Sequence, residues 1–408
     1  MLGKMKVCSL VCASLLSLGT LAATQAEAAP RALVGFFKQI HQSNDMGRDE
    51  KGEHELLHQN FAGLAVDAEL RKLHPELGAA IEARTKADWD RAQRNRKAMT
   101  KEANDFRKAV PDNYRPFTQD VDVLMRRADD YVVSYLEMEY TDTGGAHGMY
   151  GWQGVNLITD TGEELSLFHV VKDTGKLTEL IIDQLKKDYP DAPFFDLEKT
   201  VRRLALQGEL NWTIDPRGLT FYFNPYAIAP YSEGLLTATI LFKEHTQIFN
   251  EYYLDTAPEY AQPFPSYYKL VTSLNDSATR DTISVWGGVG KLHVVLNGTD
   301  TAWEVPWTDL KPVLVHMKDK RNYLYIDGCN PEGVRQTIVF KLSRGKVLHV
   351  GTLPYTFLHT IVVSPAEQHY YQFLTNPEGF YFDRSAGPGH STKTDICGVG
   401  EDGLLTYG

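Results

Sequence analysis

The sequence has little cysteine and no excess of positive charge, and each shortage argues against a class of function. Four of the 408 residues are cysteine, and no pair has the C-x-x-C spacing of a redox motif. Asp and Glu number 53 against 42 Lys and Arg, which gives a net charge of −11. Binding to nucleic acid depends on clustered Lys and Arg that displace counterions from phosphates. The composition therefore argues against a nucleic acid as partner.

Two common catalytic motifs are also missing. The chain has no G-x-S-x-G sequence, and "GGVGK" at 287–291 lacks the spacing and the Ser or Thr of a phosphate-binding loop. We therefore expect no cofactor.

Beyond residue 30, no stretch is long and apolar enough to cross a bilayer. The first residues, "MLGKMK", are basic, and the apolar run "VCSLVCASLLSLGTLAA" and the small-residue segment "AEAAP" follow. This order predicts a signal peptide over residues 1–28. The apolar run is short for the ~20 residues that a transmembrane helix needs, although a retained signal stays open as an alternative. We expect an exported protein, periplasmic or extracellular, that does not span the membrane after cleavage.

Two cysteines, Cys329 and Cys397, lie outside the predicted signal peptide, in the turn-like segments "DGCNPEG" and "TDICGVG". An oxidising compartment favours disulfides between such residues. A Cys329–Cys397 bridge is therefore predicted, with a stabilisation of about 4 kcal/mol on the chain-entropy model.

Hydrophobic periodicity predicts an α+β N-terminal domain, with helices beside a mainly antiparallel sheet, over residues 29–257. Residues 75–110 have helical spacing and no internal proline, so one or two helices are expected there, and 176–188 is a second amphipathic segment. Strand-like alternation marks 131–143 and both sides of the 224–235 turn. Residues 154–171 are predicted to form a hairpin that turns at Asp160-Thr161-Gly162.

The remainder of the chain has a different pattern. The proline-rich segment "TAPEYAQPFPSYY" at 256–268 is expected to join two domains. Residues 263–408 then contain short strands separated by turn signals. This pattern predicts an all-β C-terminal domain, as a sandwich, a barrel or a propeller-like sheet.

"HELLH" at 54–58 matches the H-E-x-x-H zinc motif. On a helix, His54 and His58 would lie one turn apart and share a zinc ion, with Glu55 as general base. The candidate third ligands, Glu76 and Glu82, have no supporting motif. We therefore expect no metal, and keep zinc binding by His54 and His58 as the weaker alternative.

The segment "GGAHGMYGW" at 144–152 concentrates residues that suit recognition. Its glycines allow positive φ angles or a close backbone approach; the loop-forming ones are Gly144, Gly145 and Gly148. His147 either contacts a ligand or hydrogen-bonds the backbone and locks this loop. Tyr150 and Trp152 either stack on a sugar or fill a partner's pocket, since aromatic residues dominate interface hot spots, or they belong to the core.

A second aromatic segment, "FYFNPYAIAPYSEG", occupies 221–234. Proline preorganises such a turn, which suits binding, and a packed corner between strands is the plainer interpretation. Tyr226 and Tyr231 are the candidate ligand-binding residues of this turn, and Pro225 and Gly234 are its loop-forming residues. Nearby carboxylates offer a glycosidase-type pair, without a fixed separation: Glu137, Glu139, Asp160, Glu163 and Glu164.

Over about residues 50–255 the chain resembles an exported bacterial family of unknown function. The family includes the lysozyme-sensing extracellular domain of the anti-sigma-V factor RsiV and the accessory domain of the peptidoglycan deacetylase PdaC. Its motif Y-x-G-G-A-H-G corresponds to Tyr140 and Gly144–Gly148, with extra residues before the glycines. Its motif F-x-F-x-P-Y-x-I-A-x-Y-x-x-G corresponds to Phe221–Gly234, and "HPEL" at 74–77 extends the match.

The resemblance implies a binding or sensing module of the cell envelope. The expected partner is peptidoglycan or another wall polymer, or a secreted lysozyme-like protein that acts on the wall. The chain lacks the sigma-binding segment and the deacetylase domain of those relatives, so only envelope binding carries over. The alternatives are an envelope hydrolase, dependent on zinc or directed at glycans, and a scaffold for another envelope protein.

Overall fold

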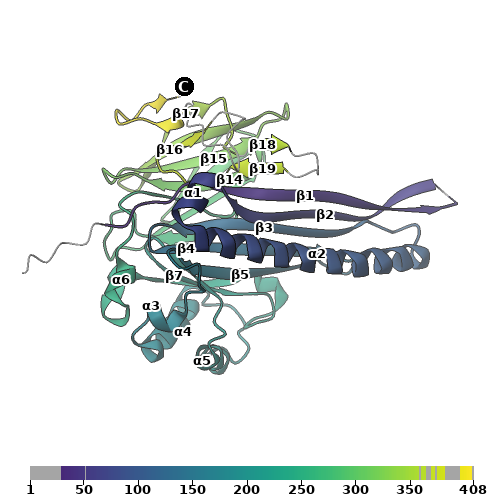
Figure 1. The fold of residues 1–408 in the computed structure, drawn as a ribbon, viewed down its shortest axis with the longest axis horizontal. Helices are drawn as coiled ribbons and strands as arrows, with labels where there is room; N and C mark the ends of the chain where they lie inside the picture. The colour runs from purple at the N-terminus through teal and green to yellow at the C-terminus, as the bar shows by residue number, and fades with distance from the viewer. Residues whose placement is uncertain are drawn as a thin grey trace, which may run out of the picture.

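A long twisted sheet with one long helix against it organises the N-terminal half (Figure 1). The computed structural model describes residues 29–50, 52–357, 360–363, 369–372, 375–381 and 396–406, and the predicted signal peptide at 1–28 lies outside these ranges. The sheet has the order β18-β19-β1-β2-β3-β4-β5. Its first five strands along the chain are β1 (Phe36–Asp49), β2 (Gly52–Val66), β3 (Phe117–Ala128), β4 (Val132–Asp142) and β5 (Met149–Ile158).

Neighbouring strands of this sheet are antiparallel except for β2 and β3. That parallel pair requires a crossover connection, which α1 (Ala68–Leu73) and α2 (Pro75–Ala109) supply. Asp67 caps α1 by accepting a hydrogen bond from the Leu70 N–H, and Pro75 begins α2, a position where its missing N–H costs nothing. Residues 75–110 were predicted as one or two helices, and 75–109 form a single helix of 35 residues, about 52 Å long.

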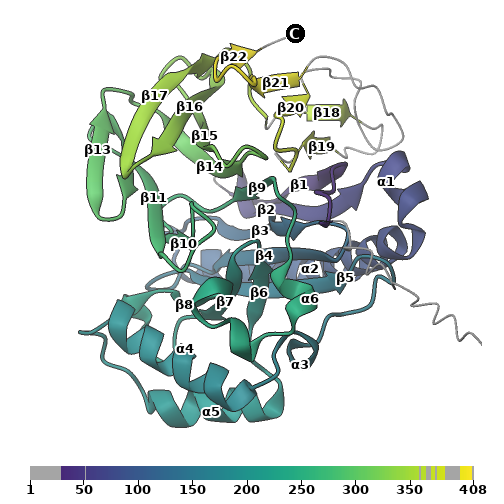
Figure 2. The same ribbon diagram turned by 90° about the vertical axis from the view of Figure 1, so that its left-hand side faces the viewer.

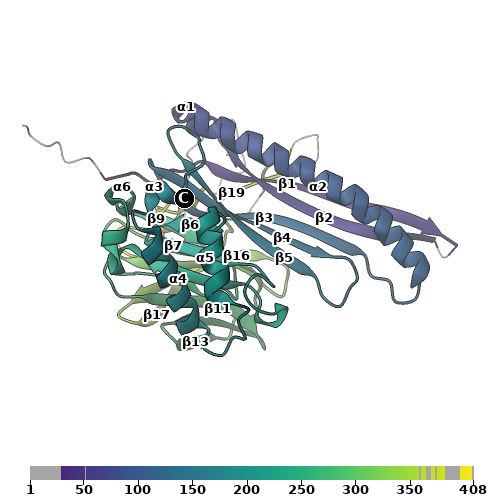
Figure 3. The same ribbon diagram turned by 90° about the horizontal axis from the view of Figure 1, so that it is seen from below.

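Helix α2 contacts the sheet along its length. Near its start, Leu77 and Ile81 are buried with the strands' apolar residues. Near its end, Met99 and Ala103 pack on Leu57 and Phe117. Between them, the Thr85 hydroxyl donates to the Leu64 carbonyl. Figure 3 shows that β4 and β5 continue beside α2 without helical cover.

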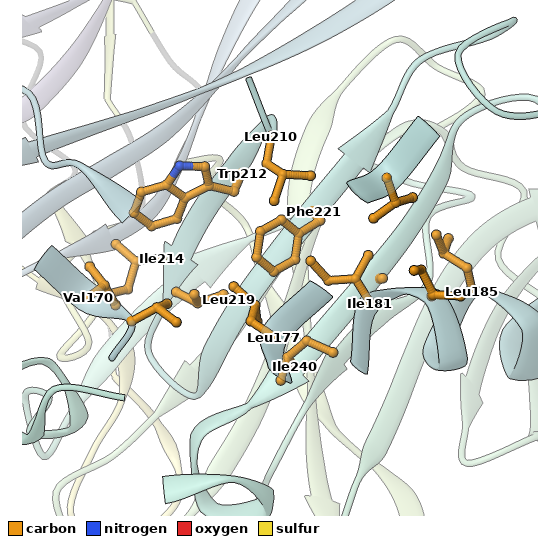
Figure 4. Packing of buried hydrophobic residues seen from close by; sticks show 14 of the residues in the cluster. Val170, Leu177, Ile181, Leu185, Leu210, Trp212, Ile214, Leu219, Phe221 and Ile240 are labelled. Atoms are coloured by element: carbon orange, nitrogen blue, oxygen red, sulfur yellow. The ribbon is translucent and has the colours of Figure 1, made fainter. Parts of the chain in front are cut away.

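A second layer packs below the first sheet, as Figure 2 shows. It is a small antiparallel sheet covered by helices, and its strands are β6 (Trp212–Asp215), β7 (Gly218–Phe223) and β8 (Leu236–Leu241). Its helices and turns are α3 (Leu167–Val170), α4 (Thr174–Asp188), α5 (Leu197–Gln207), η1 (Tyr231–Glu233), η2 (Phe242–Glu244), η3 (Thr246–Ile248) and α6 (Glu251–Leu254). Figure 4 shows Ile181 and Leu177 of α4 against Phe221 and Ile240 of the strands. The predicted helix at 176–188 and the strands beside the 224–235 turn are confirmed.

The predicted hairpin over 154–171 is only half correct. Its first arm is the C-terminal part of β5, and the second arm makes a single bridge between Leu157 and Glu164. The chain then enters α3, because the Ser166 hydroxyl accepts a hydrogen bond from the Phe168 N–H and starts a helix turn.

The C-terminal region is all-β, as predicted. Two sheets enclose its main core, in the orders β10-β11-β12-β13 and β17-β16-β15-β14-β9, and a small sheet has the order β20-β21-β22. The bounds are β9 (Tyr260–Pro263), β10 (Leu270–Thr272), β11 (Asp281–Gly288), β12 (Lys291–Leu296), β13 (Thr299–Trp303), β14 (Thr308–His316), β15 (Asn322–Cys329), β16 (Arg335–Ser343), β17 (Lys346–Leu353), β18 (Thr360–Val363), β19 (His369–Gln372), β20 (Phe380–Tyr381), β21 (Ile396–Val399) and β22 (Leu405–Thr406).

The two halves share more structure than a linker would provide. Strands β18 and β19 extend the first sheet beyond β1, and the predicted junction contains β9, an edge strand on β14. The buried guanidinium of Arg126 in β3 forms a bidentate ion pair with Asp215 of β6 at 2.7 and 2.8 Å. The same group donates to the Pro263 carbonyl of β9, so one side chain joins three elements.

The predicted Cys329–Cys397 disulfide is not formed in the structure. Cys397 is buried in a cluster with Tyr323 and Tyr325 of β15, whereas Cys329 lies four residues beyond Tyr325 on that strand, roughly 13 Å away along its axis. A disulfide needs Cα atoms within about 7 Å. Among the helices of the described ranges, none is long and apolar enough to cross a membrane.

Candidate functional site

The zinc-motif segment lies on a strand and not on a helix. His54 and His58 belong to β2, where residues four apart are separated by about 13 Å, so they cannot share one ion. The His54 ring approaches Asp49 and Tyr114, whereas His58 contacts the Asn44 side chain through Nδ1 at 2.9 Å. No group of three potential metal ligands occurs among the described residues. The geometry that a zinc peptidase needs is thus absent from this segment.

The two aromatic motifs, distant in sequence, meet at the free edge of β5. The His147 ring stacks on Tyr231 with centroids 3.6 Å apart, and the Tyr231 hydroxyl donates to the Gly148 carbonyl at 2.6 Å. Tyr150 and Tyr226 lie close to the same ring, with centroids 5.9 and 5.8 Å away. Of the candidate binding residues, all but Trp152 are therefore brought together around Tyr231.

Several of these contacts cap the outer backbone groups of β5. The Asn224 side chain accepts from the Trp152 N–H at 2.9 Å, and the Asn211 side chain accepts from the Gly154 N–H at 2.7 Å. Both amides also donate to the Trp152 carbonyl. An edge strand with unpaired groups invites pairing with another chain. Asn224 of the second motif and Asn211, which precedes β6, therefore satisfy outer backbone groups of β5.

The loop residues are fixed by packing. Gly144 has φ +75°, and a Cβ there would lie 2.8 Å from the Phe106 ring, while a Cβ on Gly148 would overlap Tyr140. Gly234 has φ +69° and sits against the Tyr150 hydroxyl. By contrast, Gly145 meets no close neighbour and is exposed.

Two aromatic residues differ in accessibility. Trp152 packs against Tyr222 and Tyr268, so much of its ring belongs to the interior. Tyr226, which follows Pro225, is 53% exposed and has φ +68°. Left-handed backbone costs a bulky residue energy and is retained where its surroundings determine it.

The main hollow of this region lies beside α2. It is a cleft of about 510 Å³ with α2 as one wall, β3 and β4 as its floor, and β5 as the opposite rim. Apolar and polar side chains alternate around it, with Tyr150, Trp152 and Asn224 at the rim. Lining residues on the wall and floor include Asp88, Arg91, Asn95, Val121, Val123, Tyr135, Glu137, Glu139 and Thr141.

A carboxyl pair joins the wall and the floor of the cleft, with Asp88 on α2 and Glu137 on β4. Burial, then the negative charge of Glu137 and a hydrogen bond to it, raise the pKa of Asp88 to about 6. Arg84 holds Glu137 by two hydrogen bonds of 2.7 and 3.0 Å, and this pairing raises the pKa of Arg84. Arg91 contacts Asp88 at 2.6 Å. The cleft therefore contains a carboxyl group that exchanges its proton near pH 6 beside a fixed carboxylate.

Glu139 is positioned by a separate row of amides. Gln93 of α2 donates to Gln59, Gln59 donates to Gln119, and Gln119 donates to Glu139, at 2.9, 2.8 and 3.1 Å. The row crosses from the helix over β2 and β3 to β4. It holds the Glu139 carboxylate on the same face of β4 as Glu137.

The sequence indicated only part of this site. Glu137 and Glu139 were among the candidate carboxylates, and both line the cleft. Asp160, Glu163 and Glu164 instead lie exposed at the turn after β5. The residues from α2 were missed, since Asp88 lies in a charged helix. Its one available signal was its position between Ala92 and Ile81 on the buried side of that helix.

Comparisons with known proteins match part of the chain. A search of curated proteins finds no match. A crystal structure of a DUF3298 family member from Bacteroides fragilis NCTC 9343 is 18% identical, covers 54% of this chain and 96% of its own, and has a TM-score of 0.36. One from Pseudomonas aeruginosa PAO1 is 17% identical, covers 55% and 98%, and also has a TM-score of 0.36. The family model "Protein of unknown function (DUF3298)" matches residues 167–243, which span α3 to β8.

Proposed function

We propose that the chain is an exported binding or sensing protein of the cell envelope and that the α2–β5 cleft is its ligand site. The ligand is a wall polymer such as peptidoglycan, or a lysozyme-like protein that acts on the wall. One observation carries the proposal: a cleft of about 510 Å³ with apolar floor residues and several polar groups. Ligand sites of proteins have this size and mixture.

The sequence supports export of the protein and the proposed class of envelope partner. Residues 1–28 have the layout of a signal peptide. The two motifs that resemble RsiV and the PdaC accessory domain meet at the rim of this cleft, where Tyr150 and Trp152 line it. Aromatic rims beside hydrogen-bonding side chains suit sugar rings and protein side chains alike.

A bulky residue in the cleft tests this proposal. Asn95 is exposed on the cleft wall, so Asn95→Trp would fill the cleft without disturbing the core. Gln207→Trp, at an exposed position of α5 outside the cleft lining, is the matched control. Retention on insoluble peptidoglycan and on immobilised lysozyme should fall about tenfold for Asn95→Trp only. Equal retention of both variants would show that the cleft is not the site.

A glycan-directed hydrolase is the second candidate. Glu137 and Glu139, two residues apart on one face of β4, place their Cβ atoms about 7 Å apart, and glycosidases use carboxylates about 5–9.5 Å apart. Asp88 supplies an acid with a raised pKa beside them. Release of soluble sugar fragments from wall polymer, lost in Glu139→Gln, would support this candidate. Unchanged polymer after prolonged incubation would exclude it.

A further inference from the structure

The outward face of α2 carries cations that the rest of the protein does not neutralise. Residues 84–108 contain nine Lys and Arg against four Asp and Glu, within a chain of net charge −11. Local basicity of this kind runs against the overall composition.

Most of the nine have a carboxylate partner. Arg84 and Arg91 bind the carboxyl groups of the cleft. Four more pairs are Lys86–Asp90, Arg96–Asp45, Arg107–Asp49 and Lys108–Asp105. Arg94, Lys97 and Lys101 remain. All three are exposed, and none forms an ion pair with any residue that the structure describes.

These three residues form a single row, here called the basic stripe. At 100° per residue, positions 94, 97 and 101 fall within about 60° of one another, and they span about 10 Å along the helix axis. The acids nearest to the row are Asp90 and Asp105, both already paired with lysines, and Glu102, about 80° around the helix from Arg94. The stripe is therefore a row of positive charges along the solvent-exposed face of α2.

The small side chains around the stripe limit what can dock there. Ala83, Ala87 and Ala98 are the apolar residues of this face, and it has no large apolar side chain to enter a bilayer. A helix that lies on a membrane needs such an apolar face beside its cations. The face therefore fits a polymer in solution better than a lipid surface.

We propose that Arg94, Lys97 and Lys101 form a docking surface for a linear polyanion of the envelope, one with repeating phosphate or carboxylate groups. The class of partner rests on the proposed envelope-binding function. The position of the binding surface rests on charge complementarity between the stripe and the polymer. Arg91 lies between the stripe and the cleft, whose wall it lines. A polymer along the stripe thus passes the mouth of the cleft.

The test compares two triple variants with the same change of charge. The stripe variant is Arg94→Gln, Lys97→Gln and Lys101→Gln. The control is Lys187→Gln, Lys199→Gln and Arg202→Gln, three exposed residues of α4 and α5. Binding is measured by fluorescence anisotropy with labelled polyphosphate and with polygalacturonate, between 50 and 200 mM salt.

The stripe variant should bind at least about tenfold more weakly than the wild type, with a shallower salt dependence, and the control should resemble the wild type. The phosphate and carboxylate probes identify the preferred anion. Equal weakening of both variants, or none, would overturn the proposal, as would binding to anionic lipid vesicles in preference to both polymers. Retention of the wild type on insoluble peptidoglycan is scored in parallel, so unchanged polyanion binding by the stripe variant, with the wild type still retained, contradicts the stripe alone. A wild type that is not retained contradicts the proposed function.

Discussion

Along the outer edge of β5, the side chains of Asn211, Asn224 and Tyr231 hydrogen-bond to the backbone of the strand and its preceding loop. Across the adjoining face of β4, polar side chains surround an open cleft instead. Both regions hold polar and aromatic residues. The difference is that the hydrogen bonds at the edge are already used within the fold, whereas the cleft leaves room for a ligand. Chemical type alone therefore does not identify a binding site.

The largest expected effect concerns the edge of β5. A Cβ on Gly154 would lie 1.9 Å from the Trp212 carbonyl oxygen. Gly154→Ala must therefore separate β5 from β6, and overpacking of this kind should lower the free energy of unfolding by about 3 kcal/mol. Gly151→Ala is the control on the same strand, since its nearest neighbour is 3.8 Å away. Urea unfolding of both variants measures the difference, and an equal loss would contradict the close contact.

A smaller loss of stability is expected when a side chain that hydrogen-bonds to the outer edge of β5 is removed. Asn224→Ala leaves the Trp152 N–H without its acceptor, which should lower the free energy of unfolding by about 2 kcal/mol. Asn95→Ala, on the cleft wall, should change it by less than about 0.5 kcal/mol. If the two amide substitutions cost the same, the contrast between edge and cleft is wrong.

The smallest effect is a pH dependence inside the cleft. Because the pKa of Asp88 is raised in the folded protein, its ionisation opposes folding, and stability should rise as pH falls from about 7 toward 4. Asp88→Asn should reduce this dependence and add about 1 kcal/mol at pH 7. Part of the dependence should remain, because burial raises the pKa of Asp327 to about 6 as well. Thermal unfolding between pH 4 and 8 measures it. A slope that Asp88→Asn leaves unchanged would assign the dependence to other groups.

Protonation of His316 should lower stability as pH falls, whereas protonation of Asp88 should raise it, so the two contributions must be distinguished. Burial lowers the pKa of His316, which contacts Arg217 at 3.2 Å and Asn322 at 2.7 Å. The stability that the neutral ring contributes is present above pH 6.5 and is lost as pH falls. His316→Gln should therefore reduce the loss of stability below pH 6.5, both in the wild type and in the Asp88→Asn variant. If the double variant loses as much stability below pH 6.5 as Asp88→Asn alone, this assignment is contradicted.

Periodicity predicted the elements whose burial pattern is regular. α2 and α4 follow from their apolar spacing, and the β-rich C-terminal region follows from its short alternating segments. The pattern does not contain the tertiary contacts that join the halves, such as the Arg126–Asp215 pair between β3 and β6. Zinc binding by His54 and His58, kept as the weaker alternative, fails because H-E-x-x-H describes a zinc site only on a helix, whereas Leu57, Gln59 and Phe61 alternate as buried residues of a strand.

The sequence located only part of the candidate site, again because local patterns do not contain tertiary contacts. Tyr150 and Trp152 were identified by type, and they do line the cleft rim. Asp88 and the amide row from Gln93 to Glu139 depend on α2 crossing the sheet, and no local pattern encodes that crossing. The predicted disulfide was wrong because turn-like sequence around Cys329 and Cys397 does not show how far apart the turns lie.

Hydrogen–deuterium exchange with and without solubilised wall fragments distinguishes the cleft from the β5 edge, because it reports on both in one experiment. Slower exchange is expected in residues 84–95 of α2 and 137–141 of β4 when fragments are added. Residues 143–148 and 224–234, whose contacts are internal, should change less. Protection confined to those two segments, or absent throughout, would contradict the assignment of the cleft as the binding site.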